Sequence, residues 1–330
     1  AGVGVRDAFA PTWDELVDRS LPVALPDLPA GASPRQVAAW WGALPALAQR
    51  ALVQQRTAAV GALDGVPAWA RDRANRLLLA RALHRPTPSP TARAVAELLA
   101  THEAAGARVQ LHLFDEAGQR VAVGLGDTDT ADAVALLVPG IGTTPVDDLG
   151  ALTAQLAGVV SAARAAGARA PAGLAWLGYR PPRGAAILRR ERAEEAGPVL
   201  DRALDGLAAA RGVVGRPAAR TTVVAHSYGT VVLDEAADAP GRLAAAAVVL
   251  LGSPGMEPTG AAGLEAGEVH VAATGGDPIS WSGWFGPSPW ADRFGARDLP
   301  VGPGTGHSDY LDPGRPTLPA VGAVVAGRSG

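Results

Sequence analysis

The stretch Thr221-Thr222-Val223-Val224-Ala225-His226-Ser227-Tyr228-Gly229-Thr230 joins an apolar, β-branched run to a serine between two small residues. This pattern is typical of a nucleophile elbow, a turn in which the serine alone separates a strand from a helix. The serine is held in a strained conformation, and the positions two before and two after it must be small because strand and helix nearly touch there. Ala225 and Gly229 meet this requirement, and no other serine of the sequence has such neighbours.

The flanking residues decide between an elbow and a chance match in a chain rich in Ala and Gly. Residues 221–225 predict a buried strand, and residues 231–237 predict a helix. This is the strand-turn-helix context that the motif requires. We therefore interpret Ser227 as a candidate nucleophile.

The composition limits the class of protein. With 330 residues the chain is long enough for one large domain with an appendage or for two domains, and 48% hydrophobic residues supply a sizeable core. The net charge of −3 and the pI near 6.1 argue against a nucleic-acid or anionic-membrane partner. The absence of Cys excludes disulfides, thiolate metal sites and a cysteine nucleophile.

The hydropathy pattern predicts no transmembrane segment. The longest apolar run, residues 243–251, is far too short to cross a bilayer. The amino terminus lacks the charged-then-apolar pattern of a signal peptide, so we expect a soluble chain. The cytoplasm is slightly favoured over secretion as a mature form, and the sequence leaves the oligomeric state open.

The first third of the chain predicts an arm and a helical appendage. Residues 1 to about 32 contain four prolines and little periodicity, which indicates an extended arm. Ser33-Pro34 then provides an N-cap followed by proline at the first helical position. Apolar residues at helical spacing continue to about residue 105, with helical stretches at 69–84 and 91–105. We therefore divide the chain into an arm plus helical appendage, residues 1–105, and a catalytic domain, residues 106–330.

From Arg108 onward the hydrophobic period changes from helix to strand. Residues 109–114 and 121–125 alternate as the two strands of a hairpin. Five apolar runs suit buried parallel strands, at residues 133–138, 174–177, 221–225, 244–251 and 269–273. Helix-length segments such as 146–166 and 185–210 lie between them. The pattern predicts an α/β fold with a mostly parallel central sheet flanked by helices.

A serine nucleophile needs a general base, and the base is oriented by a carboxylate. On this type of sheet the three follow one another as serine, acid and histidine. Two histidines follow Ser227: His270 lies inside a predicted strand, where a structural role is expected, and His307 lies in a glycine-rich loop beyond the last strands. We therefore predict His307 as the base.

The acid should follow a strand. Asp277 comes directly after the strand that contains Val269 and Val271, and it is the first choice. Glu257, after the preceding strand, is the main competitor, and Asp298 is a weaker one.

Acyl transfer also needs N–H donors for the developing oxyanion. The backbone N–H of Tyr228 is the first candidate, and the second should come from the loop at residues 139–145, from Ile141 or Gly142. A phosphate-binding loop is excluded because no Gly-Lys-Ser/Thr follows. We expect neither a metal nor a cofactor.

The candidate substrate-binding residues lie in two loops. Between Asp277 and His307 the chain carries four aromatic side chains, Trp281, Trp284, Phe285 and Trp290. Two interpretations stay open. These residues cover the site, exclude water and favour an apolar substrate portion, or they only pack a long loop onto the core. Arg180 places a cation in the loop after the fourth strand and is added to the candidates.

From about Ser33 to its end, the chain resembles an actinobacterial family of α/β-hydrolase-fold proteins of largely unassigned function. The matching phrases include Trp40-Trp41, Leu63-Asp64-Gly65-Val66-Pro67, Arg71-Asp72-Arg73-Ala74-Asn75-Arg76, Val138-Pro139-Gly140-Ile141-Gly142, Trp176-Leu177-Gly178-Tyr179, Leu251-Gly252-Ser253-Pro254-Gly255, Gly276-Asp277-Pro278, Phe294-Gly295-Ala296 and Gly306-His307-Ser308-Asp309-Tyr310, beside the elbow itself. The resemblance implies the hydrolase fold and a Ser-Asp-His triad at Ser227, Asp277 and His307, and it implies no substrate. The chain departs from the family at Ala225, where Gly is usual, and at Arg180, where an acidic residue is usual.

Two classes of function follow. The first is a serine hydrolase that cleaves a small-molecule carboxylic ester through an acyl-Ser227 intermediate; an amidase, thioesterase, lipase or acyltransferase would use the same residues. The second is a non-catalytic binding protein that keeps the fold and docks through its helical appendage. The complete Ser-Asp-His series favours the enzyme.

Overall fold

The computed structural model describes residues 25–328. Most of the predicted arm, residues 1–24, lies outside the described residues. Residues 25–32 contain neither helix nor strand. Ser33 caps the first described helix in a capping box with Gln36, as its position before Pro34 predicts.

Eight strands form a single sheet in the order β1-β2-β4-β3-β5-β6-β7-β8. They are β1 (Val109–Asp115), β2 (Arg120–Leu125), β3 (Ala133–Val138), β4 (Pro171–Leu177), β5 (Arg220–His226), β6 (Ala247–Leu251), β7 (Glu268–Ala272) and β8 (Arg297–Asp298). Strand β2 is antiparallel to both of its neighbours, and all other pairs are parallel. The predicted hairpin and parallel strands are confirmed, and this order is that of the α/β-hydrolase fold.

Helices connect and cover the strands. They are α2 (Pro34–Ala43), α3 (Ala46–Gln55), α4 (Thr57–Ala62), α5 (Ala68–Leu83), α6 (Pro90–Ala104), α7 (Leu149–Ala165), α8 (Glu191–Val213), α9 (Tyr228–Ala237) and α10 (Thr317–Val325), with 3-10 turns η1 (Gly184–Leu188), η2 (Ala261–Leu264) and η3 (Asp292–Phe294). One expected helix starts later than predicted. The segment from Ala185 begins as the turn η1, and Arg189 is extended (φ −117°, ψ 146°), so the α-helix starts only at Glu191.

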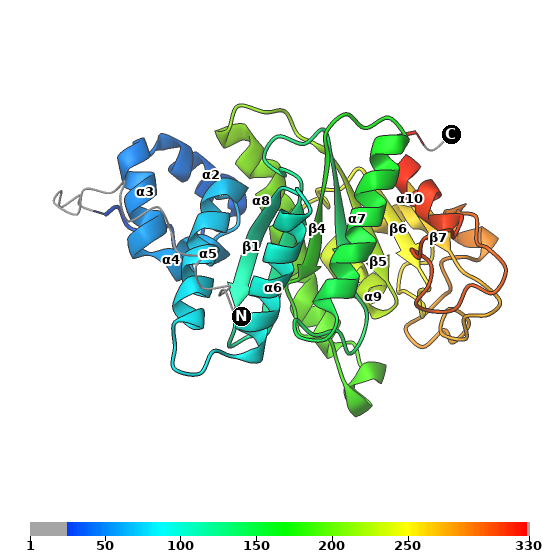
Figure 1. The fold of residues 1–330 in the computed structure, drawn as a ribbon. Helices are drawn as coiled ribbons and strands as arrows, with labels where there is room; N and C mark the ends of the chain where they lie inside the picture. The colour runs from blue at the N-terminus through cyan, green and yellow to red at the C-terminus, as the bar shows by residue number, and fades with distance from the viewer. Residues whose placement is uncertain (1–24, 329–330) are drawn as a thin grey trace.

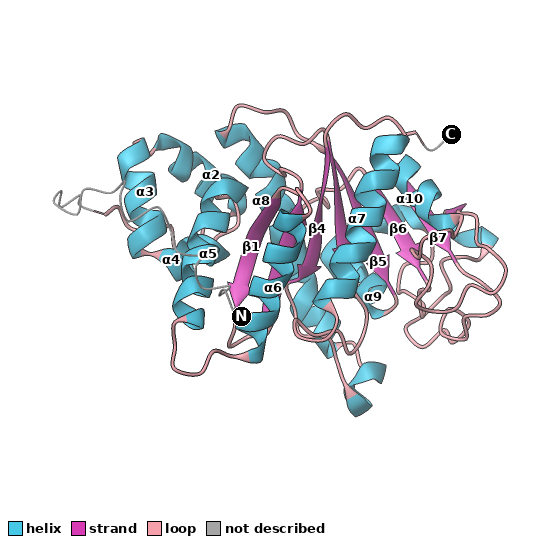
Figure 2. Cartoon of the chain, viewed as in Figure 1, coloured by secondary structure: helices cyan, strands magenta, loops and turns pink. Residues whose placement is uncertain are grey.

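Helices cover both faces of the sheet (Figure 1). Apolar side chains of α6, α7 and α10 cover one face, and those of α8 and α9 cover the other. Figure 2 shows the strands between these helices. The loops after β3, β4 and β7 and the turn after β5 follow the carboxyl ends of these strands. Because the carboxyl ends of parallel strands meet at one edge, side chains from these separate loops can converge there.

Helices α2 to α5 lie beside β1, at one end of the sheet (Figure 1). They form a core of their own around the buried Trp41. Helix α5 also supplies polar partners to the exposed edge of β1. Asp72 accepts the N–H of Leu111 (2.6 Å), Asn75 donates to the carbonyl of Leu111 (3.0 Å), and Arg76 donates to the carbonyl of Val109 (3.1 Å).

Residues 71–76, a segment that matches the family, therefore have a structural role at the edge of β1. The unpaired backbone groups of an uncovered edge strand can pair with another chain and cause aggregation, and α5 bonds three such groups of β1. The side chains of α6 belong to the same core cluster as the sheet. The division of the chain at residue 105 therefore stays a prediction.

His112 on β1 is a buried histidine away from the carboxyl edge of the sheet. Its side chain is 2% exposed, and its Nε2 lies 3.2 Å from the hydroxyl of Thr128. Burial, with a smaller effect of the Arg71 charge, lowers the pKa of His112 from 6.5 to about 3. His112 is therefore protonated near pH 6.5 in the unfolded chain, but only near pH 3 in the folded chain. The free energy of unfolding falls as the pH falls from 6.5 to 3.

We expect the variant His112→Asn to lose less stability on acidification than the wild type does. The contribution of His112 is at most about 1.4 kcal/mol per pH unit between pH 6.5 and 3. Urea titrations at pH 7 and at about pH 4.5 measure the free energy of unfolding. The matched control is His84→Asn, at an exposed position. Equal pH dependence in wild type and His112→Asn would contradict the assignment.

Candidate active site

Ser227 lies between β5 and α9 in a backbone conformation that side chains rarely adopt. Its φ is 54° and its ψ is −127°. The N–H of Ser227 donates to the carbonyl of Leu251 on the neighbouring strand (2.9 Å), and the carbonyl of Ser227 accepts the hydroxyl of Thr230 (2.7 Å). These bonds hold the strained turn, which is the geometry that the sequence predicts for a nucleophile elbow.

Small residues make this turn possible. A Cβ atom on Gly229 would lie 2.4 Å from the carbonyl oxygen of Val138. A Cβ on Gly140 would lie 2.8 Å from the Cβ of Ser227. Since neither contact is sterically allowed, the glycines let the turn and the loop after β3 approach each other.

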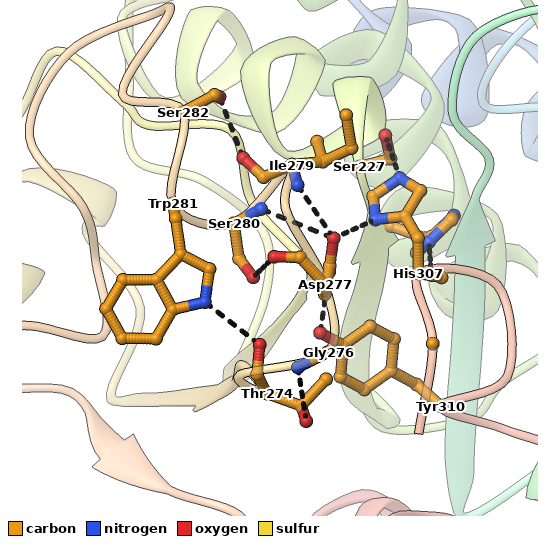
Figure 3. A network of polar contacts seen from close by, with 12 residues as sticks. Ser227, Thr274, Gly276, Asp277, Ile279, Ser280, Trp281, Ser282, His307 and Tyr310 are labelled. Atoms are coloured by element: carbon orange, nitrogen blue, oxygen red, sulfur yellow. Dashed lines mark hydrogen bonds and ion pairs between the residues drawn. The ribbon is translucent and has the colours of Figure 1, made fainter. Parts of the chain in front are cut away.

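His307 joins Ser227 to Asp277 (Figure 3). Its Nδ1 lies 2.9 Å from Oδ1 of Asp277, and its Nε2 lies 2.8 Å from Oγ of Ser227. The carboxylate can only accept, so Nδ1 carries the proton and Nε2 is left to accept the hydroxyl proton of Ser227. The three residues come from loops after three different strands, and the fold places them in one hydrogen-bonded chain.

Asp277 is fully buried and is surrounded by donors. Besides His307, Oδ1 accepts the backbone N–H groups of Ile279 (3.0 Å) and Ser280 (3.4 Å). The hydroxyl of Tyr310 donates to Oδ2 (2.7 Å). Burial raises the pKa of Asp277, but the bonds from His307 and Tyr310 outweigh it and lower the pKa to about 2. Asp277 is therefore a carboxylate at neutral pH.

Two further residues support this hydrogen-bonded chain, and neither was assigned a role from the sequence. Tyr310 orients Asp277, and its position three residues after His307 in the matched phrase was a usable signal. Nε2 of His226 lies 2.6 Å from the carbonyl oxygen of His307, and the two rings lie 4.7 Å apart. Burial, together with the nearby His307, lowers the pKa of His226 to about 4. His226 is therefore neutral at pH 7 and donates through Nε2.

The competing candidates lie elsewhere. The side chain of Glu257 is 61% exposed and pairs with Arg190 (3.4 Å). Asp298 is an exposed residue of the short strand β8. His270 is buried beside Glu268, with Nε2 3.3 Å from Oε2 of that residue.

Of the two oxyanion donors predicted in the loop after β3, Ile141 and Gly142, one has a free N–H. The N–H of Gly142 already donates to the carbonyl of Pro182 (3.2 Å). Within residues 25–328 the N–H of Ile141 has no acceptor. The N–H of Tyr228 lies in the first turn of α9, where backbone donors have no partner within the helix. Of the two predicted loop donors, the geometry favours Ile141.

Hydrogen bonds from the loop after β4 hold this donor loop in place. The hydroxyl of Tyr179 donates to the carbonyl of Pro139 (2.6 Å), and Arg183 donates to the carbonyl of Gly142 (3.0 Å). Burial raises the pKa of Tyr179 well above its ordinary value, so its hydroxyl remains a donor.

Two pockets meet at Ser227, His307 and Ile141. The larger has a volume of about 310 Å³ and lies against α7. The smaller has a volume of about 100 Å³ and lies beside Tyr228. Both are lined by residues 137–311, so the helices α2 to α6 do not contribute to them.

The predicted substrate-binding residues divide into two groups. Trp284 and Phe285 line the smaller pocket. Trp281 and Trp290 line neither pocket, because they pack against each other (4.2 Å between ring centroids) and donate to the carbonyls of Thr274 and Ser280. Figure 3 shows the Trp281 indole turned toward Thr274 and away from His307. Arg180 is exposed and also lines neither pocket.

Residues 25–328 contain no group of three or more His, Asp or Glu side chains that could hold a metal ion. Over the same residues, no helix combines the length and the apolar character needed to cross a bilayer.

Comparison with known proteins identifies the family. The sequence matches the family described as alpha/beta hydrolase over residues 115–286. The uncharacterized protein Rv2079 of Mycobacterium tuberculosis is 28% identical over 326 residues, which cover 86% of this chain and 48% of that protein. The chain thus spans about half the length of this relative.

A second relative is matched over most of its length. The uncharacterized protein Rv0963c of Mycobacterium tuberculosis is 32% identical over 247 residues, which cover 68% of this chain and 87% of that protein. Among solved structures, the esterase LipW from Mycobacterium marinum is 16% identical, with 72% of this chain and 87% of that chain covered and a TM-score of 0.44. The resemblance to an actinobacterial family is confirmed, and this chain belongs to the alpha/beta hydrolase family.

Proposed function

We propose that this protein hydrolyses carboxylic esters of small molecules through an acyl-serine intermediate, with Ser227 as nucleophile, His307 as general base and acid, and Asp277 as the orienting carboxylate. One observation carries the proposal. A serine at a strained strand-to-helix turn donates its hydroxyl to a histidine whose other nitrogen donates to a buried carboxylate. A serine hydroxyl is a weak nucleophile at neutral pH, and this arrangement supplies the base that activates it.

In the first half of the reaction, Oγ of Ser227 attacks the ester carbonyl carbon while Nε2 of His307 takes the hydroxyl proton. The carbonyl oxygen becomes an oxyanion, which the N–H groups of Tyr228 and Ile141 stabilise. The tetrahedral intermediate then collapses, the bond to the alkoxy oxygen breaks, and the imidazolium of His307 protonates the leaving alcohol. Asp277 stays ionised throughout, and its charge stabilises the imidazolium.

The second half repeats these roles with water. His307 removes a proton from a water molecule, and the hydroxide oxygen attacks the acyl carbon. The new oxyanion binds the same two N–H groups. Collapse releases the carboxylic acid and returns the proton from His307 to Ser227.

A fluorophosphonate probe tests the proposal, because it forms a covalent adduct only with an activated serine. We expect wild type to gain the mass of one adduct in intact-mass spectrometry, and Ser227→Ala to gain none. His307→Ala should react more slowly by about two orders of magnitude or more, since it lacks the base. The matched control Ser161→Ala, at an exposed position of α7, should be labelled like wild type. A folded wild type without an adduct, or an adduct that persists in Ser227→Ala, would refute the proposal.

A further inference from the structure

The two pockets at Ser227 lie on opposite faces of the sheet and differ in chemistry. The smaller pocket is on the α9 side, where Phe285 stacks edge-on against Tyr228 (5.5 Å between ring centroids). The larger pocket is on the α7 side, where Leu152 and Leu311 line it. Ser227 stands between them, so the two substituents of a bound ester carbonyl have two separate places to lie.

The smaller pocket suits a short apolar chain. Its wall away from the reacting atoms is built from apolar and aromatic side chains, namely Ile141, Ile187, Pro254, Ile279, Trp284 and Phe285. A volume of about 100 Å³ holds roughly three water molecules, or a similar number of carbon atoms. This wall offers no charged group.

The larger pocket has polar groups placed in an apolar wall. Helix α7 and its N-cap present Asp148, Ala151, Leu152 and Gln155 to it, at the i, i+3, i+4, i+7 spacing of a single helix face. Oδ2 of Asp148 accepts the N–H of Thr144 (2.7 Å). Within residues 25–328, Oδ1 of Asp148 and the side-chain amide of Gln155 have no hydrogen-bond partner.

These free groups recognise hydroxyls. A carboxylate oxygen accepts O–H donors, and a primary amide both donates and accepts. A hydroxyl that reaches them exchanges its water contacts for bonds in a partly enclosed site. An apolar group in the same place would take water away from Asp148 and Gln155 without giving them a partner. This cost against apolar alcohols contributes more to the preference for hydroxylated alcohols than the new hydrogen bonds do.

The position of His307 sets which part of the ester goes where. The leaving oxygen must lie beside Nε2 of His307, which protonates it. Ser308, Tyr310 and Leu311, which follow His307 in the chain, line the larger pocket and not the smaller. The oxyanion donor Tyr228 lines only the smaller one. His307 and Ile141 themselves line both pockets, so it is the residues after His307 that favour the larger pocket for the alcohol part and the smaller pocket for the acyl part.

We propose that the substrates are esters of a short apolar acyl group with a polyhydroxylated alcohol, whose hydroxyls bind Asp148 and Gln155. This assignment rests on the ester hydrolysis proposed above. It makes Gln155 a determinant of specificity for the alcohol and Ile187 a determinant for the acyl chain.

Two matched pairs of substrates test the assignment. Glyceryl 1-monobutyrate and propyl butyrate share one skeleton and differ by two hydroxyls on the alcohol. We expect wild type to prefer the glyceryl ester by about tenfold or more in kcat/KM, and Gln155→Leu to lower that ratio by roughly three- to tenfold. p-Nitrophenyl butyrate should be preferred over p-nitrophenyl acetate by about tenfold or more. Ile187→Trp, which fills the smaller pocket, should remove this second preference, and Ser161→Ala should change neither ratio.

The outcomes separate this assignment from the proposed function. An unlabelled Ser227 and no turnover of any of the four esters would refute ester hydrolysis itself. Turnover with no preference for the glyceryl ester, or a preference that Gln155→Leu leaves unchanged, would overturn only the assignment of the alcohol. The assignment would also fail if the effects were crossed, with Gln155→Leu changing the acyl preference and Ile187→Trp changing the alcohol preference. Labelling of Ser227 without turnover would exclude this substrate class.

Discussion

Replacing Ser227 with alanine is expected to reduce kcat for ester hydrolysis by about 10⁶-fold. The variant keeps the oxyanion donors and both pockets, but it has no oxygen to form the acyl intermediate. Water would have to attack the ester directly, from a position that the site is not built to hold. The residual rate would come from substrate binding and the two N–H donors alone.

The measurement is the steady-state rate with p-nitrophenyl butyrate for wild type, Ser227→Ala and the control Ser161→Ala. The circular dichroism spectra and melting temperatures of the three proteins establish that they fold alike. A loss of less than about tenfold in Ser227→Ala would place the nucleophile elsewhere. A comparable loss of rate in Ser161→Ala would show that the rate falls because the protein is destabilised, and not because the nucleophile is missing.

Replacing Asp277 with asparagine is expected to lower kcat by about 10⁴-fold with a small change in KM. The two side chains have the same shape, so the substitution introduces no steric change. An amide, however, carries no charge to stabilise the imidazolium of His307. Its NH₂ group can also face Nδ1, which would favour the tautomer with the proton on Nε2, where it cannot accept from Ser227.

The matched control is Glu257→Gln, which makes the same chemical change at the competing carboxylate. Glu257 is exposed and pairs with Arg190, so its loss should change kcat by less than about twofold. Equal losses in Asp277→Asn and Glu257→Gln would contradict the geometry of the site. A fully active Asp277→Asn would show that His307 needs no ionised partner.

The sequence alone did not decide between Asp277 and Glu257 as the orienting carboxylate. Both follow a predicted strand, and their spacing from Ser227 did not separate them decisively. The structure distinguishes them by environment: Asp277 is fully buried under four donors, while Glu257 reaches toward solvent. Such an environment is made by loops that are distant in sequence, so no local pattern encodes it.

The aromatic loop gave a similar result. Its four large aromatic side chains occur within ten residues, and no local pattern separates those that line a pocket from those that do not. In the structure Trp284 and Phe285 line the smaller pocket, and Trp281 and Trp290 hold the loop together by a tilted ring contact and by two N–H bonds to carbonyls. Trp281 and Trp290 thus pack the loop together, and a role of Trp284 and Phe285 in binding an apolar substrate portion stays a prediction.

The sequence by itself determined the elbow, the hairpin, the parallel strands and the bounds of α5 and α6. These features follow from local rules: small residues where backbones touch, a period of two or 3.6 in hydrophobicity, and caps at helix ends. Only the tertiary structure decided that Tyr310 and His226 support the histidine, that α5 seals the edge of β1, and that two unlike pockets meet at Ser227. The physical reason is that these hydrogen bonds join residues 33 to 81 positions apart, whose proximity depends on how the sheet and its loops pack.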